Sequence, residues 1–253
     1  MQSVEALRSL GKRTSSRISA MTLCIAAACQ HAGESRVVCC FDAKVGSDYE
    51  ASESAYKFKT LSDQAVGMFS GPLLPAEDLI SDYAQHLTGR TLTRATYREE
   101  LWEPMKTHLA NASKHEGFVD GAGDSPQVLV VIGIDNQFRL VSIDERGISE
   151  APYFAAIGTG ADSAISSLRW RKPDNNTSMH SVLYYAYEAK RFGEVSPHVG
   201  GFTYIKIIGL RPGSYLAQTI VLPNGIKRLN KAFAEFGPQP LDKYWHLPED
   251  EIV

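Results

Sequence analysis

The sequence has few cysteines, and this scarcity narrows the classes of protein to which it can belong. The 253-residue chain carries four cysteines, Cys24, Cys29, Cys39 and Cys40, which form no C-x-x-C pair, and the seven histidines do not cluster beside them. A zinc site is therefore not expected, and no metal or organic cofactor is implied. So few cysteines in so long a chain favour a reducing compartment, and we expect a cytoplasmic protein with four buried thiols.

The sequence also lacks an excess of basic charge and lacks long apolar runs. The formal net charge is −3, whereas a protein whose main partner is a nucleic acid is normally basic. No stretch approaches the ~20 apolar residues of a membrane-spanning helix. Neither nucleic acid nor a membrane is therefore expected as a partner. A hydrophobic content of 43% and a charged content of 22% are typical of a globular chain long enough to bury a substantial core.

The first twenty residues differ in composition from the rest of the chain. They carry four basic residues, one acid and five serines, with no continuous apolar stretch, so a secretory signal is excluded. They fit a targeting peptide, a propeptide or an upstream start codon with Met21 as the true initiator. We therefore interpret residues 1–21 as an N-terminal extension. Because no linker-like shift in composition follows, we interpret residues 22–253 as a single domain.

Hydrophobic patterning predicts alternating blocks of strands and helices. The predicted strands are 22–30, 36–45, 55–61, 65–70, 127–134, 138–143, 153–157, 202–208 and 215–221, and the predicted helices are 75–87, 93–114, 162–171 and 178–192. The last thirty residues show no regular pattern. This order favours an α+β fold with two antiparallel sheets and helices outside them. We expect the first four strands to form one antiparallel meander.

Strand pairing places four chemically informative residues at the same level of that meander. With turns near residues 32–33, 50 and 63, we expect Thr22, Asp42, Lys57 and Gly71 to lie in one row across four adjacent strands, within a residue or two of register. If Thr22 begins the mature chain, its α-amino group, with a pKa near ~8, can act as general base for its own hydroxyl. A lysine held by an aspartate would favour the ionised hydroxyl, and the Gly71 N–H could stabilise an oxyanion.

These segments resemble the proteasome β-type subunit family, bacterial proteasome-like proteins among them. The similarity lies in TLCIAAAC, FDAK, AYKFKTL and MFSG, then in AAIGTGADSAISSL and AYEAKRFGEVSPHVGGFTYIKII, and it spans roughly residues 22–210. The resemblance implies a four-layer αββα sandwich of the N-terminal-nucleophile (Ntn) hydrolase type, in which helices flank two antiparallel sheets. It also implies a threonine-type endopeptidase that cuts peptides or unfolded proteins inside rings of identical subunits.

By position, the resemblance implies a role for each matching residue. Thr22 would be nucleophile and base, Asp42 and Lys57 would be the charge pair that tunes it, and Gly71 would supply the oxyanion N–H. Thr159, in Gly158-Thr159-Gly160, stands where the family usually has serine, and we expect its hydroxyl to support the site. That segment could instead cradle a phosphate, but the neighbouring strands form no βαβ unit. The chain has no nucleotide-binding motif, so any ATP-dependent unfoldase would be a separate partner.

Several positions depart from the family pattern. Ser196 stands where the family usually has aspartate, and Val199 stands where it usually has serine. We therefore expect fewer polar groups around the α-amino group of Thr22 than the family has. Asp42 lies about four residues further from Thr22 than usual, which a longer first hairpin would absorb. Met21 replaces the glycine that normally precedes the threonine, which favours translation that begins at Met21 followed by removal of the methionine. Two alternatives therefore stay open beside the threonine peptidase. They are a non-catalytic structural or binding subunit of the same fold and an Ntn amidase that acts on a small molecule.

Overall fold

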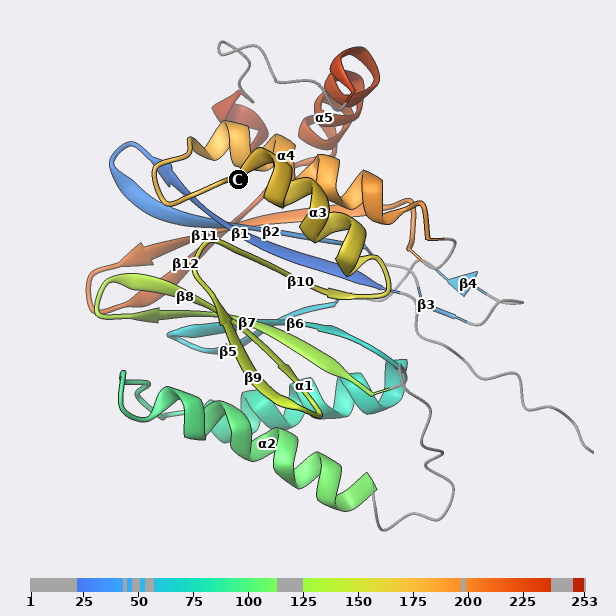
Figure 1. Ribbon diagram of the computed structural model, residues 1–253. Coiled ribbons are helices and arrows are strands. Elements are labelled where there is room, and N and C mark those ends of the chain that lie inside the picture. Colours follow the sequence, from blue (N-terminus) through green and yellow to red (C-terminus); the bar gives the residue numbers. More distant parts are fainter. Residues whose placement is uncertain are drawn as a thin grey trace, which may run out of the picture.

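The computed structural model describes residues 22–42, 45–46, 51–52, 57–112, 125–196, 199–237 and 248–252. The expected extension at residues 1–21 lies outside these ranges. The described elements stack in four layers, with helices on the outer face of each of two sheets (Figure 1). The predicted α+β, αββα sandwich is therefore confirmed.

Each large sheet has five antiparallel strands. One has the order β10-β1-β2-β11-β12, with bounds Phe154–Gly158, Leu23–His31, Glu34–Asp42, Thr203–Arg211 and Tyr215–Ile220. The other has the order β5-β6-β7-β8-β9, with bounds Phe58–Ser62, Ala65–Ser70, Gln127–Ile134, Gln137–Asp144 and Gly147–Ala151. A short pair, β3 (Val45–Gly46) and β4 (Ala51–Ser52), lies in the connection between β2 and β5.

The helices divide between the two outer faces of the sandwich. Helices α3 (Ala161–Arg171), α4 (Met179–Gly193) and α5 (Pro223–Phe236) cover the sheet that contains β1, and α1 (Leu73–Leu87) and α2 (Tyr97–Ala112) cover the other sheet (Figure 1). A short 3-10 helix, Glu249–Glu251, follows near the C-terminus. Within the described ranges, none of these helices is long and apolar enough to cross a membrane.

Burial on both faces explains the continuous apolar runs of the central strands. Successive side chains of a strand point to opposite faces, so Leu23, Ile25 and Ala27 pack toward the helices, whereas Cys24 and Ala26 join the core between the two sheets. Strand β7 is divided between two cores in the same way. A strand of this kind needs apolar residues at every position, which is the pattern that the sequence carries.

The expected meander of the first four strands is wrong. Strands β1 and β2 form a hairpin in one sheet, and β5 and β6 form a hairpin in the other. The physical reason is the connection at residues 43–56, which is too long for a tight hairpin turn and carries the chain from one sheet to the other. Register within each hairpin agrees with the prediction, because Cys24 pairs with Phe41 and Phe58 pairs with Met68.

Apart from the two-residue strands β3 and β4 and the 3-10 helix, two elements were not predicted. Strand β9 and helix α5 were both missed, although α5 carries Ile226, Leu229 and Phe233 at helical spacing on its packed face. The predicted start of the second helix, at Thr93 to Tyr97 with Thr93 as cap, is met at its later end. Helix α2 begins at Tyr97, because Thr93 heads a turn in which its carbonyl accepts hydrogen bonds from the N–H groups of Thr96 and Tyr97.

Candidate active site

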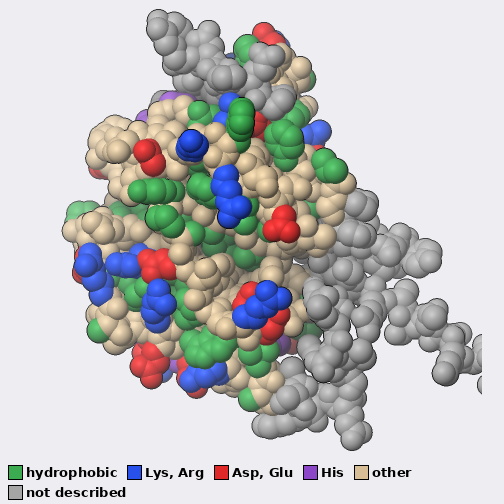
Figure 2. Space-filling view, in the orientation of Figure 1, with side chains coloured by type: hydrophobic (Ala, Val, Ile, Leu, Met, Phe, Trp, Pro, Cys, Tyr) green, Lys and Arg blue, Asp and Glu red, His purple; other side chains and the backbone are tan. Residues whose placement is uncertain are grey.

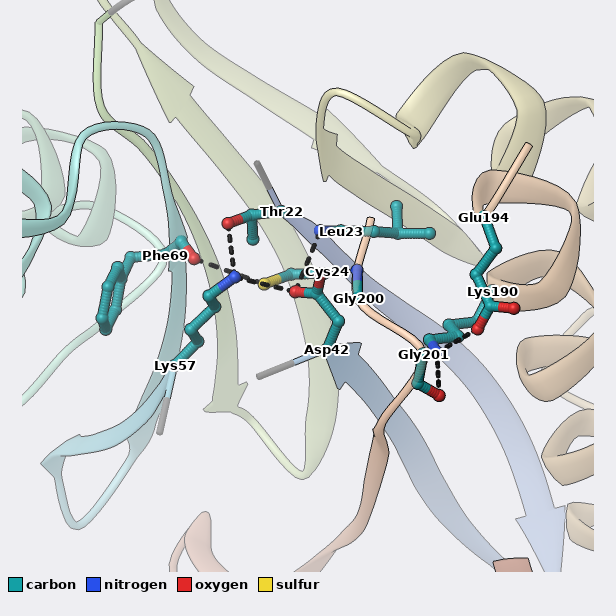
Figure 3. A network of polar contacts seen from close by, with 10 residues as sticks. All are labelled: Thr22, Leu23, Cys24, Asp42, Lys57, Phe69, Lys190, Glu194, Gly200 and Gly201. Carbon is teal, nitrogen blue, oxygen red and sulfur yellow. Dashed lines mark hydrogen bonds and ion pairs between the residues drawn. The ribbon is translucent and has the colours of Figure 1, made fainter. Parts of the chain in front are cut away.

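The open ends of the two hairpins meet at one end of the sandwich. Because β1 and β2 are antiparallel, Thr22, just before β1, lies beside Asp42 at the end of β2. Lys57 directly precedes β5 in the facing sheet. Its ammonium donates to Thr22 Oγ1 at 2.5 Å and to Asp42 Oδ1 at 2.8 Å (Figure 3). The structure therefore brings together three of the five predicted site residues.

This cluster is removed from solvent. Thr22, Asp42 and Lys57 are 1%, 0% and 2% exposed. At such burial an ion pair is stable only if further hydrogen bonds satisfy its remaining polar atoms. The Leu23 N–H donates to Asp42 Oδ1 at 3.3 Å, and the Gly200 N–H donates to Asp42 Oδ2 at 2.7 Å. Both carboxylate oxygens thus have backbone donors, and Oδ1 also faces the ammonium.

Strand β10 passes very close to the backbone of Thr22. Gly158 ends this strand opposite Leu23 and has a φ of +97°. A Cβ at Gly158 would lie 2.1 Å from the carbonyl oxygen of Thr22. Its N–H donates to Gln127 Oε1 at 2.9 Å. The positive φ and the lack of room for a Cβ atom therefore both require glycine at position 158. Because this residue has no side chain, the backbone of β10 can lie directly against the backbone of Thr22.

Gly71 lies just after β6, where the chain turns toward α1. Its φ is +115°, and a Cβ there would lie 2.7 Å from the Cα atom of Pro126. The neighbouring end of β6 contacts β1, since Cys24 Sγ donates to the carbonyl oxygen of Phe69 at 3.4 Å (Figure 3). Gly71 is thus placed at the same end of the sandwich as Thr22. Its role as oxyanion donor stays a prediction.

Thr159 is placed differently from the other predicted site residues. It lies in the turn between β10 and α3, its side chain is exposed, and among the described residues its hydroxyl takes no part in the network of Thr22, Asp42 and Lys57. Val199, which stands where the resembling family has serine, is buried in the apolar core beneath α4. The supporting role of Thr159 stays a prediction.

Three residues near the site were not singled out from the sequence. Gly200 belongs to a segment that carries the family resemblance, but no role in the site was predicted for it, and its N–H binds Asp42. Lys190 and Glu194, an i,i+4 pair at the end of α4, hold the loop that carries Gly200. A signal for Lys190 was present, because this charged residue falls on the apolar stripe that contains Leu183 and Ala186.

Cys24 lies two residues after Thr22 and is fully buried. Burial raises the pKa of its thiol far above the ordinary value, and the Lys57 ammonium only partly opposes that rise. The group is therefore a neutral thiol at physiological pH, and a neutral thiol is a poor nucleophile. The hydroxyl of Thr22, which contacts the lysine, is the better candidate for nucleophile. Within the described ranges, no group of three or more His, Cys, Asp or Glu side chains is arranged to hold a metal ion.

Comparison with known proteins agrees with this architecture. No protein-family model matches the chain, and no curated protein matches it by sequence. A crystal structure of eukaryotic HslV from Trypanosoma brucei is similar to it, with a TM-score of 0.52 and 14% sequence identity. The alignment covers 74% of this chain and 98% of the HslV chain. At this level of identity the similarity establishes the fold alone, the four-layer αββα sandwich.

Proposed function

We propose that this chain is a threonine-type amide hydrolase with Thr22 as its nucleophile. The observation that carries the proposal is the buried contact of the Lys57 ammonium with both the Thr22 hydroxyl and the Asp42 carboxylate. A positive charge at 2.5 Å from Oγ1 stabilises the alkoxide that forms during attack. The carboxylate holds that ammonium in place.

The mechanism requires a free amine on Thr22, and hence removal of residues 1–21. The α-amine takes the hydroxyl proton as Oγ1 attacks the substrate carbonyl, and a C–O bond forms. The Gly71 N–H is the proposed donor to the resulting oxyanion. The C–N bond then breaks, and the leaving amine takes the proton from the α-ammonium. Water, deprotonated by the same amine, attacks the ester and restores the hydroxyl.

We further propose peptides or unfolded proteins as substrates and a ring of identical subunits as the working assembly, with any ATP-dependent unfoldase as a separate protein. These points rest on the sequence resemblance. Native mass spectrometry tests the assembly. A closed ring of identical chains supports the peptidase proposal, whereas a monomer or dimer favours an amidase for small molecules.

The deciding experiment compares the wild type with Thr22→Ala and Thr22→Ser. Intact mass first establishes whether the purified chain begins at Thr22. We expect Thr22→Ala to lower kcat/KM on fluorogenic peptides by ~10³-fold or more, because both attack and acyl transfer need the hydroxyl, and Thr22→Ser to keep measurable turnover. Full activity in Thr22→Ala, or in a chain that retains residues 1–21, would refute the proposal.

A non-catalytic subunit of the same fold is the second candidate. It is favoured by the apolar environment of Val199 and by the exposed position of Thr159, which leave fewer polar groups around Thr22 than the resembling family has. A threonine-directed electrophile, such as a peptide epoxyketone, separates the two candidates. A hydrolase gains the mass of the inhibitor at Thr22, whereas a non-catalytic subunit that begins at Thr22 stays unmodified.

A further inference from the structure

The loop between α4 and β11 is attached to α4 by a buried lysine. Lys190 is 0% exposed, and its ammonium donates to the carbonyl oxygen of Gly201 at 3.0 Å. The same ammonium pairs with the carboxylate of Glu194, one turn further along the chain (Figure 3). Glu194 also pairs with Arg191 at 2.6 Å. The Nζ atom of this lysine thus contacts both the first and the last residue of the loop 194–201.

This attachment lies one residue from a contact of the candidate active site. The carbonyl that Lys190 holds belongs to Gly201, and the N–H that binds Asp42 Oδ2 at 2.7 Å belongs to Gly200. Two consecutive glycines have more backbone freedom than any other pair of residues. Holding the Gly201 carbonyl restricts the rotations that would turn the Gly200 N–H away from Asp42.

Among residues 194–196 and 199, the described backbone bonds lie within the loop or reach the end of α4. Val199, next to Gly200, offers only apolar contacts to the core beneath α4. The backbone bonds of Ser196 and Val199 close turns within the loop, from Ser196 N–H to the Gly193 carbonyl and from Val199 N–H to the Ser196 carbonyl. These turns shape the loop, and the bond from Lys190 fixes its far end.

We propose that Lys190 is a positioning residue for the candidate active site. It acts through the Gly200–Gly201 backbone, whose N–H orients the Asp42 carboxylate so that Oδ1 faces the Lys57 ammonium. The inference rests on the proposed function, because it assigns Lys190 a part in the reaction of Thr22. A buried lysine is costly to desolvate, and an apolar residue would suit this stripe of α4 if packing were its only task.

The first test replaces Lys190 by methionine, glutamine or arginine in the wild-type chain. Methionine keeps the apolar stem and removes the donor, and the shorter glutamine is the milder substitution should Lys190→Met fail to fold. We expect either variant to lower kcat by about 10- to 100-fold with KM within about 2-fold, since misplacement of a supporting group affects the chemical step. Lys190→Arg keeps a charged donor and should recover kcat to within about 5-fold of wild type.

Two control variants separate positioning from general stability. The variant Arg171→Met/Glu188→Gln removes the neighbouring buried ion pair between α3 and α4, which makes no contact with the loop of residues 194–201 among the bonds described. It should lower the unfolding midpoint and leave kcat unchanged. Glu194→Gln keeps an acceptor for Lys190 but removes the charge that compensates its buried ammonium, so it should lower the unfolding midpoint, and it should lower kcat less than Lys190→Met does, because the bond to Gly201 remains.

Amide hydrogen exchange of the segment 199–204 gives a readout that needs no activity. Lys190→Met should speed exchange of the Gly200 amide, and Arg171→Met/Glu188→Gln should not. The inference is overturned if folded Lys190→Met and Lys190→Gln keep wild-type kcat, or if Lys190→Arg does not recover kcat. It is also overturned if kcat falls equally in Arg171→Met/Glu188→Gln, or if exchange of the Gly200 amide is unchanged in Lys190→Met. If the wild type is inactive and a peptide epoxyketone does not modify Thr22, the proposed function is refuted instead. Faster exchange of the Gly200 amide in Lys190→Met would still establish that Lys190 holds the loop.

Discussion

At the scale of single residues, the ammonium of Lys57 is the group on which the proposed mechanism depends. It lies between a hydroxyl at 2.5 Å and a carboxylate at 2.8 Å, all three side chains being buried. Desolvating a lysine and an aspartate is unfavourable, and the pair is stable because each charge offsets the other and backbone donors satisfy the carboxylate. Removing one partner therefore affects both the chemistry and the stability of the fold.

We expect Lys57→Met to abolish turnover and to destabilise the protein. Without the ammonium, the Asp42 carboxylate stays buried with only backbone donors, which costs about 3–5 kcal/mol of unfolding free energy. Urea denaturation measures this loss. Lys57→Met/Asp42→Asn should recover part of the stability and none of the activity, because the uncompensated charge is gone while the hydroxyl still lacks its cation. If the loss of unfolding free energy in the double variant equals the sum of the losses in Lys57→Met and in Asp42→Asn, the two residues are not energetically coupled.

At the scale of elements, much of the sandwich could be predicted because local patterns determine it. The bounds of β6 and β7 agree with the predicted strands 65–70 and 127–134. Strand β9 was missed because its sequence, GISEA, is half-buried at a sheet edge and has no apolar run. Helix α5 was missed because its apolar residues are separated by lysines, arginine and asparagine, and only their spacing reveals the packed face.

The proximity of Thr22, Asp42 and Lys57 could be predicted even though the meander was wrong. Each residue lies at the open end of a hairpin, and hairpin register is a local property. Which sheet each hairpin joins depends on long-range packing between the sheets, and no local pattern specifies it. The apolar stripe of α4 singles out Lys190 as a buried charge, but its connection to the site was not predictable from local pattern, because that connection depends on the contact of Gly200 with Asp42, 158 positions away in sequence.

The close approach of β10 to β1 allows a test by one added methyl group. We expect Gly158→Ala to lower both activity and stability, because its Cβ would lie 2.1 Å from the Thr22 carbonyl oxygen and must displace it. Gly147→Ala is the matched control. Gly147 also has a positive φ, +135°, but nothing lies within 4 Å of its Cβ position. It should therefore show only the strain of a positive φ, roughly 1–2 kcal/mol.

Peptide hydrolysis and thermal unfolding of the two glycine variants distinguish steric displacement from strain. Gly147→Ala should keep wild-type kcat with a modestly lower unfolding midpoint. Gly158→Ala should lose at least ~10-fold in kcat, since Thr22 is moved relative to Lys57. Equal kcat in the two variants would mean that the position of Thr22 does not depend on β10.

At the scale of the whole molecule, the fold buries ionisable groups in its interior and keeps the surface mixed in charge. On the face drawn in Figure 2, basic and acidic side chains are interspersed, in keeping with a net charge of −3. All four cysteines are free and buried within the sheet that contains β1. Burial raises the pKa of Cys29 and of Cys40 to about 12, and it raises the pKa values of Cys24 and Cys39 further.

These buried thiols, with Tyr184 and Tyr187, predict a loss of stability in alkali. Burial also raises the pKa of each of these tyrosines to about 12. Below pH ~8.5 a thiol is neutral in both the folded and the unfolded chain, so stability does not depend on it. Above that pH the unfolded chain releases the proton and the folded chain keeps it, so unfolding becomes easier until the folded pKa is reached.

We expect the free energy of unfolding to fall by about 1.4 kcal/mol per pH unit for each buried thiol, between pH ~9 and the folded pKa. Urea denaturation under reducing conditions, repeated from pH 7 to pH 11, measures the fall. Cys29→Ala should make it shallower, because one proton fewer is released on unfolding. A free energy of unfolding that stays constant up to pH 11 would mean that the thiols of β1 and β2 reach solvent in the folded protein.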